Sequence, residues 1–204
     1  MIRRRLLVCP AVCCLAAVSA GGLSLPAIGG VVLLAQGKVN LTFTPEDEKF
    51  ADAADAYRRL WADEGDAIIE GLERVSGLKF LERDVKAIIF EGASSSGFGS
   101  TPMRLRGSYP VDVKKATLAH ELGHRMNTQL RTRPPDVDEH RLLFLYLYDV
   151  WESLWGKEFA DRQVVVESGR KGLYDYETAW KWALALSKEE RASRFAEIVR
   201  VNRR

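Results

Sequence analysis

The hydrophobic positions that follow residue 44 recur every three or four residues, which is the spacing of one face of an α-helix. The positions that carry this pattern are Phe50, Ala54, Tyr57, Trp61, Ile68, Leu72 and Val75. Thr44 can cap such a helix, and Pro45 stands at the first helical position, where proline is well tolerated. The pattern predicts one long helix after Thr44, or two helices with a break near Gly65.

Two shorter segments have the patterns of β-strands. Residues 85–90 are a run of β-branched and apolar side chains, and residues 103–109 alternate between apolar and polar positions. We expect these two strands to pair with each other. The segment between them, GASSSGFGST at 92–101, is too rich in glycine and serine for regular structure. It is predicted to be a loop, either a mobile rim over a cleft or an ordinary hairpin connection.

Helical periodicity returns in the second half of the chain. Helices are predicted at about 113–128 and 137–155, separated by the proline-containing segment RTRPPD at 131–136. The helix at 137–155 is apolar on nearly every side, so it must be buried. Two further helices follow, and Ser187 and Glu190 have the spacing of a capping box at the start of the last one.

Together these elements predict a mainly helical α+β fold, with a small β-sheet that precedes the helix at 113–128. No linker divides residues 38–204, which we expect to form a single domain. The composition, 47% hydrophobic and 28% charged with a formal net charge of +2, offers no general basic surface for nucleic acid. The arginines near the C-terminus, among them Arg191 and Arg194, are expected to line a solvated helix face.

Residues 1–36 have a different composition from the rest. Three arginines precede two apolar runs, and small residues occur at Val18-Ser19-Ala20, as in a secretory signal peptide that is cleaved after Ala20. The segment could instead remain as a membrane tether, or the functional chain could begin near Lys38. The first two alternatives predict export or attachment to a membrane, and the third predicts a cytoplasmic protein.

The chemistry of the chain is concentrated in its three histidines. Two of them lie in the predicted helix at 113–128, in the order His120-Glu121-Leu122-Gly123-His124. Histidines four positions apart lie one above the other on a helix, so both can present a ring nitrogen to one metal ion. Glu121 is rotated by about 100° from His120 and can reach a water molecule on the open side of the ion. This is the geometry of a general base in metal-assisted hydrolysis.

This motif resembles the HExxH active-site helix of the zincin metallopeptidases. The uncharged neighbours Leu118, Leu122 and Met126 fit that helix, whereas Arg125 departs from it, because the position is usually uncharged. Three later segments are also similar to small bacterial zincin-like proteins: 144–151, 159–168 and 174–184.

The resemblance implies a zinc-dependent peptidase in which His120 and His124 bind Zn²⁺ and Glu121 is the general base. It further implies that the small sheet offers an edge strand to a peptide substrate. We expect a peptide or protein as the substrate, no nucleic acid, and a membrane contact only through residues 1–36. The alternative is a catalytically silent zincin-type module that binds a metal or a partner peptide.

A catalytic zinc site needs a third protein ligand besides the two histidines. If the helices at 113–128 and 137–155 form an antiparallel hairpin, His124 faces position 140, which is the remaining histidine. His140 is therefore the expected third ligand. Glu139 is the alternative, because the gluzincin branch of the family uses a glutamate on its next helix.

Several further residues are candidates for supporting roles. The later acids Asp149, Glu152, Glu158 and Glu167 remain as other candidates for the third ligand. Asp149 lies on the apolar helix and needs a buried partner; it is expected to accept a hydrogen bond from a ligand imidazole, or else to pair with an arginine. The groups that could stabilise an oxyanion are Tyr109, Tyr146, Tyr148 or an arginine.

Overall fold

The first element of the computed structural model, which describes residues 38–172 and 174–203, is a strand that the sequence pattern did not predict. Strand β1 (Asn40–Pro45) buries Leu41 and Phe43 and exposes Asn40, Thr42 and Thr44, which alternate with them. The prediction of a helix that starts at Pro45 was wrong, because this proline ends the strand. Asp47 instead caps a short 3₁₀ turn, η1 (Glu48–Phe50), by accepting a hydrogen bond from the backbone N–H of Lys49.

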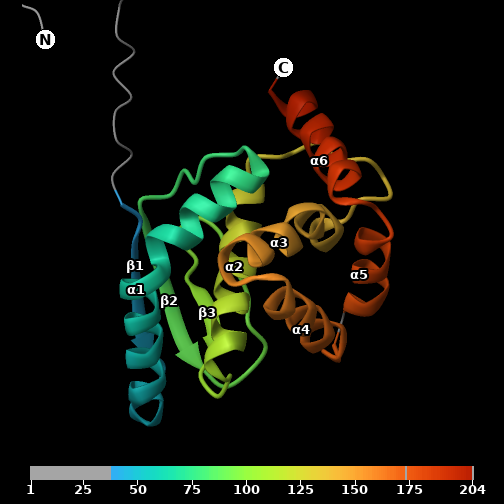
Figure 1. The fold of residues 1–204 in the computed structure, drawn as a ribbon. Coiled ribbons are helices and arrows are strands. Elements are labelled where there is room, and N and C mark those ends of the chain that lie inside the picture. Colours follow the sequence, from blue (N-terminus) through green and yellow to red (C-terminus); the bar gives the residue numbers. More distant parts are fainter. Residues whose placement is uncertain (1–37, 173, 204) are drawn as a thin grey trace, which may run out of the picture. The chain divides into compact units, whose positions relative to one another are not determined.

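The predicted long helix is continuous. Helix α1 (Ala51–Ser76) runs through Gly65 without a break and ends at Gly77, whose φ of 69° lies in the left-handed region that glycine tolerates. It returns the chain to the sheet, so that β2 (Asp84–Phe90) pairs with β1 in a parallel direction. This strand–helix–strand unit places α1 against the buried face of the sheet (Figure 1).

The two predicted strands pair, but not as a hairpin. Strand β3 (Met103–Arg106) is parallel to β2, and the sheet has the order β1-β2-β3. Two consecutive parallel strands start at the same end of the sheet, so the chain must cross back between them, which takes about a dozen residues. The glycine- and serine-rich segment at 91–102 makes that return without a helix. The expectation of a hairpin connection was therefore wrong.

The returning loop covers the outer edge of β3. Ser95 forms two backbone hydrogen bonds with Arg104, each 2.9 Å long, and the Ser94 hydroxyl accepts a hydrogen bond from the Arg106 N–H. The backbone groups of Arg104 that face away from β2 are thus already paired. A peptide substrate cannot add to this edge at Arg104 unless the loop moves, contrary to the expectation of an open edge strand there.

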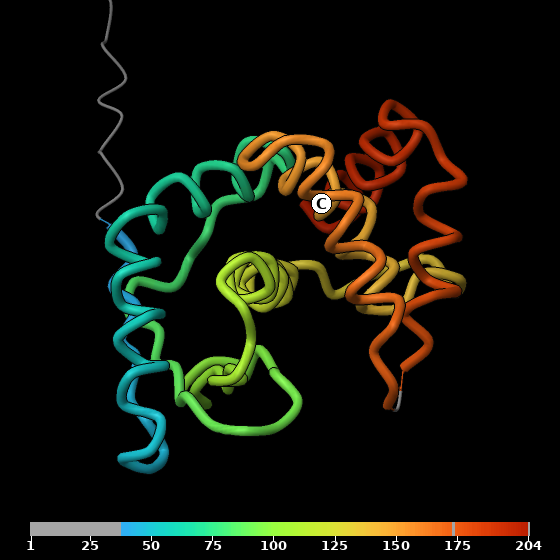
Figure 2. The backbone as a smooth tube through the Cα atoms, turned by 60° about the horizontal axis from the view of Figure 1, so that its bottom comes forward, coloured from blue at the N-terminus to red at the C-terminus, as the bar shows by residue number. Residues whose placement is uncertain are grey.

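The remaining elements are helices, and they confirm the mainly helical α+β class. They are α2 (Val111–Asn127), α3 (Glu139–Trp155), α4 (Lys157–Ser168), α5 (Tyr176–Leu184) and α6 (Lys188–Asn202). The capping box predicted for the last helix is present, with hydrogen bonds in both directions between Ser187 and Glu190. Figure 2 views α2 almost along its axis and shows the other elements arranged around it.

A glycine in the motif permits the central helix packing. A Cβ atom at Gly123 would come within 2.5 Å of a Leu143 methyl group and 3.1 Å of the Tyr146 hydroxyl oxygen, so a side chain there would force the packed side chains of α3 to shift. The contact of Gly123 with Leu143 and Tyr146 lies further along α3 than a simple antiparallel hairpin would place it. Accordingly, α3 crosses α2 (Figure 1). As predicted, α3 is buried on nearly every side, from Leu142 through Trp151.

The predictions made for residues 1–36 lie outside the residues that the structure describes. Within the described ranges, no helix combines the length and the apolar character that a membrane span requires.

Candidate metal centre

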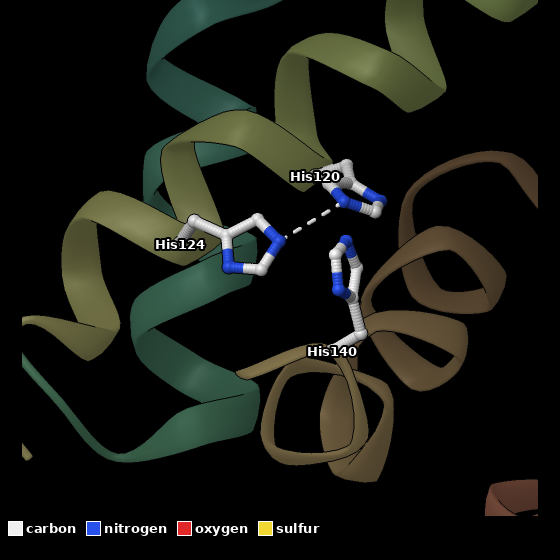
Figure 3. A group of neighbouring side chains, drawn as sticks. All are labelled: His120, His124 and His140. Atoms are coloured by element: carbon white, nitrogen blue, oxygen red, sulfur yellow. Dashed lines mark hydrogen bonds between the residues drawn. The ribbon is translucent and has the colours of Figure 1, made fainter. Parts of the chain in front are cut away.

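Helix α2 presents two imidazoles to the same point. The Nε2 atoms of His120 and His124 lie 3.1 Å apart, and both residues are buried (Figure 3). Two nitrogens that bind one tetrahedral zinc ion at 2.0–2.1 Å stand about 3.4 Å from each other. The separation is thus close to the one that a shared ion requires, as the spacing of four residues on a helix predicts.

The third imidazole comes from α3. His140 lies in the first turn of that helix, and its ring centroid is 5.5 Å from that of His120 and 4.8 Å from that of His124. One nitrogen from each of the three rings lies within 4.8 Å of the others, and Figure 3 shows the His140 ring pointing toward the pair. Among the described residues, this is the one group of three or more potential ligand side chains placed so closely.

Glu139, the alternative third ligand, points elsewhere. Its side chain is 64% exposed, and a carboxylate oxygen lies 3.7 Å from the Arg133 guanidinium. The structure therefore brings together His120, His124 and His140 and leaves Glu139 outside the cluster.

The donor set suits zinc. Burial, followed by repulsion from the neighbouring His120, holds the pKa of His124 well below its ordinary value. The same two causes lower the pKa of His140 to about 4. Both rings are therefore neutral at physiological pH, which is the form that binds a metal. Three neutral imidazoles with a fourth position left for water are a known donor set of catalytic zinc sites.

A buried carboxylate supports His120 from the other side. Glu167, on α4, is fully buried, and its Oε1 atom lies 2.9 Å from Nδ1 of His120, in close contact but without the alignment of a hydrogen bond. Burial alone would raise the pKa of Glu167, but His120 and Arg170 outweigh it and hold the pKa below its usual value. A carboxylate in this place favours a proton on Nδ1, which leaves Nε2 free for a metal. The sequence offered Glu167 only as a candidate third ligand.

Asp149 does not take the role expected from the sequence. Its carboxylate forms three hydrogen bonds of 2.8–3.1 Å with the Arg191 guanidinium, and both side chains are buried. The alternative expectation, a pair with an arginine, describes it correctly. Arg191 is therefore not part of a solvated helix face, because its side chain is buried against Asp149 and neutralises it.

Glu121, the general base expected from the motif, is buried beside the three histidines. The Ser96 hydroxyl donates a hydrogen bond of 2.7 Å to Oε2 of Glu121. Burial raises the pKa of Glu121, and the neighbouring His120 and the Ser96 hydrogen bond oppose that shift. Because Ser96 engages Oε2, the other oxygen of this carboxylate is left for a further donor.

Arg125 explains why the loop stays next to Glu121. This buried side chain pairs with Glu82 and donates hydrogen bonds to the carbonyl oxygens of Ser96 (2.8 Å), Gly99 (2.9 Å) and Thr101 (3.2 Å). The charge that looked foreign to an HExxH helix therefore ties the 92–101 loop to α2. Ser96 is held so that its carbonyl faces Arg125 while its hydroxyl faces Glu121.

The tyrosines named as oxyanion groups lie in different surroundings. Tyr146 donates toward Gly123 O and Asn127 inside the helix packing, and Tyr148 donates to Asp161. Tyr109 lies beside the guanidinium groups of Arg106 and Arg170, with its ring centroid 5.2 and 5.7 Å from them. None of these three tyrosines has its ring in contact with a histidine ring.

The sequence missed the two aromatic residues closest to the cluster. Tyr174 stacks on His140 with ring centroids 4.0 Å apart, and its hydroxyl donates to Asp138. Tyr176 stands edge-on to His140, at 4.8 Å, and is 6.3 Å from His120. Their sequence looked like ordinary core material, so no local signal distinguished them.

An open cleft of about 370 Å³ adjoins the cluster. His124 lines it together with Phe98 of the 92–101 loop, so this loop contributes to the wall of the cleft. Comparison of the chain with protein-family models, with curated proteins and with solved structures found no match. The functional conclusion therefore depends on the geometry of the site.

Proposed function

We propose that this protein is a zinc-dependent peptidase of the zincin type. The observation that carries the proposal is the arrival of His140, from a separate helix, beside the pair of imidazoles on α2. A helix with two exposed histidines would satisfy the HExxH pattern by chance, but it would not bury them with a third imidazole and a supporting carboxylate. His120, His124 and His140 are the residues that would hold the metal.

The chemistry follows from where the side chains lie. A zinc ion held there supplies a Lewis acid that lowers the pKa of water and polarises a peptide carbonyl. Glu121 accepts the proton of the attacking water on the oxygen that Ser96 leaves open, and then delivers it to the leaving amine. Ser96 orients the carboxylate through the other oxygen. Tyr176, next to His140 and His120, replaces the three tyrosines named from the sequence as the candidate donor to the carbonyl oxygen.

The decisive experiment is metal analysis of the purified full chain. We expect about one zinc ion per chain, the amount that a single three-histidine site holds. A chelator should abolish the hydrolysis of a peptide library, and added zinc should restore it. His140→Ala is expected to lose the metal, while Glu139→Ala, one residue away, retains it and serves as the matched control.

Two results would contradict this proposal in different ways. Zinc that remains near one equivalent in His140→Ala would show that another residue is the third ligand. No stoichiometric metal in the unmodified protein would remove the site altogether and leave a purely structural role for the histidines.

The support from Glu167 leads to a separate prediction. Glu167→Gln keeps the side-chain volume and the acceptor for Trp180, but removes the charge next to His120 and to Arg170, whose guanidinium lies 3.2 Å from the carboxylate. Loss of such a supporting carboxylate typically weakens metal affinity or activity by about 10–100-fold. We expect a change of this size in the zinc dissociation constant, measured by competition with a chelator. Glu158→Gln, an exposed position on the same helix, should leave the constant unchanged.

A further inference from the structure

The cleft next to His124 carries an excess of positive charge. Arg131 and Arg133 both line it, and the one acid on its wall is Glu139. Arg133 lies 3.7 Å from that exposed carboxylate, whereas the structure, as far as it describes the chain, shows no ion pair for the Arg131 guanidinium. The cleft therefore has one more guanidinium than carboxylate, immediately beside a proposed metal ligand.

The arginines stand on an anchored segment. The side-chain oxygen of Asn202, at the end of α6, accepts hydrogen bonds from the backbone N–H groups of Arg131 (2.7 Å) and Thr132 (2.9 Å). The Asn202 amide in turn donates to the Thr132 carbonyl at 2.8 Å. These bonds hold the backbone at Arg131 and Thr132, so the side chains, and not this backbone, are what must be ordered when an anion binds between the guanidinium groups.

The other walls of the cleft suit a short aliphatic stem. The buried side chains of Leu130 and Leu142 line it, together with the exposed ring of Phe98. Its volume of about 370 Å³ lies within the usual range for ligand pockets, at the small end. A guanidinium matches a carboxylate with two parallel hydrogen bonds, a geometry that an ammonium group does not offer.

We propose that this cleft is a substrate subsite for a carboxylate, and that the enzyme prefers peptides that carry one next to the scissile bond. The inference rests on the proposed peptidase function and adds its substrate class. The carboxylate can belong to an aspartate or glutamate side chain or to the C-terminus of the peptide. Glu139 competes for Arg133, so its charge sets how strongly the subsite attracts the substrate.

The test compares peptides that differ at one position. Peptides with Glu or Gln at each position flanking the cleavage site, each with a free or an amidated C-terminus, are assayed for kcat/KM with the full-length zinc-loaded protein. We expect a preference of about tenfold or more for one carboxylate, as for hydrogen bonds to a charged group. A preference for Glu that survives amidation identifies a side chain, and one lost on amidation identifies the C-terminus.

Variants then assign the preference to the cleft. Arg131→Ala/Arg133→Ala should bring the ratio of the two peptides close to one, whereas Glu139→Gln should increase it. Arg59→Ala, an exposed arginine on α1, is the matched control and should not change it. An unmodified enzyme without a preference, or a preference that persists in the double variant, would overturn the subsite.

A binding measurement separates this inference from the proposed function. The Glu and Gln peptides are labelled with a fluorophore, and their binding to zinc-loaded Glu121→Gln is followed by anisotropy. If the unmodified protein cleaves no peptide, the peptidase proposal fails, but tighter binding of the Glu peptide that depends on Arg131 and Arg133 still supports the subsite. Equal binding of both peptides refutes it.

Discussion

Replacing Glu121 by Gln is expected to lower the rate of peptide hydrolysis by about 10²–10⁴-fold, the usual contribution of a positioned general base. The amide has the same shape as the carboxylate and can still accept the hydrogen bond from Ser96. It cannot accept a proton from water, so the metal ligands and the cleft remain while proton transfer is lost. The measurement is kcat/KM on a cleaved peptide, together with the zinc content of the same preparation.

The control for this variant changes a carboxylate to an amide on the same helix. Asp112→Asn alters an exposed residue in the first turn of α2 and should leave both the rate and the zinc content unchanged. Hydrolysis by Glu121→Gln at the rate of the unmodified protein would exclude Glu121 as the base. An unmodified protein that binds zinc but cleaves nothing would instead favour the catalytically silent module.

The parts of the site that the sequence predicts are those set by local geometry. His120 and His124 lie on one helix, and a separation of four residues determines that their rings are neighbours. His140 is close to them because the short segment between α2 and α3 leaves the start of α3 near the end of α2. The antiparallel register selected the right residue even though the helices cross, since His140 lies only one residue from the start of α3.

The parts that the sequence did not predict depend on packing between distant segments. Ser96 reaches Glu121 because Arg125 holds three carbonyl groups of the loop, and nothing in a run of glycine and serine indicates such an anchor. Glu167 reaches His120 across 47 positions, through the placement of α4. Strand β1 was missed for a related reason. Its partner β2 comes only after α1 in the sequence, and the last residues of β1 resemble the start of a helix.

Asp149→Ala is expected to lower the free energy of unfolding by about 3–5 kcal/mol, because it leaves the buried Arg191 charge without its partner. The change should be measured by urea denaturation of the zinc-saturated full chain. Glu152→Ala, three residues further along α3, is the control: its more exposed pair with Lys188 should contribute about 1 kcal/mol or less. The double variant Asp149→Leu/Arg191→Met removes both charges and should recover most of the stability.

The buried carboxylates of Asp149 and Glu167 should therefore differ in their effect on zinc binding. Asp149→Ala is expected to weaken folding while the folded protein keeps its zinc affinity, because this carboxylate touches Arg191 and no metal ligand. Glu167→Gln is expected to weaken zinc binding as well as folding, because both His120 and Arg170 lose a charged neighbour while Trp180 still has its acceptor. If Asp149→Ala instead weakened zinc binding without lowering stability, the metal-supporting role expected from the sequence would be the correct one, and Arg191 would be only an incidental neighbour.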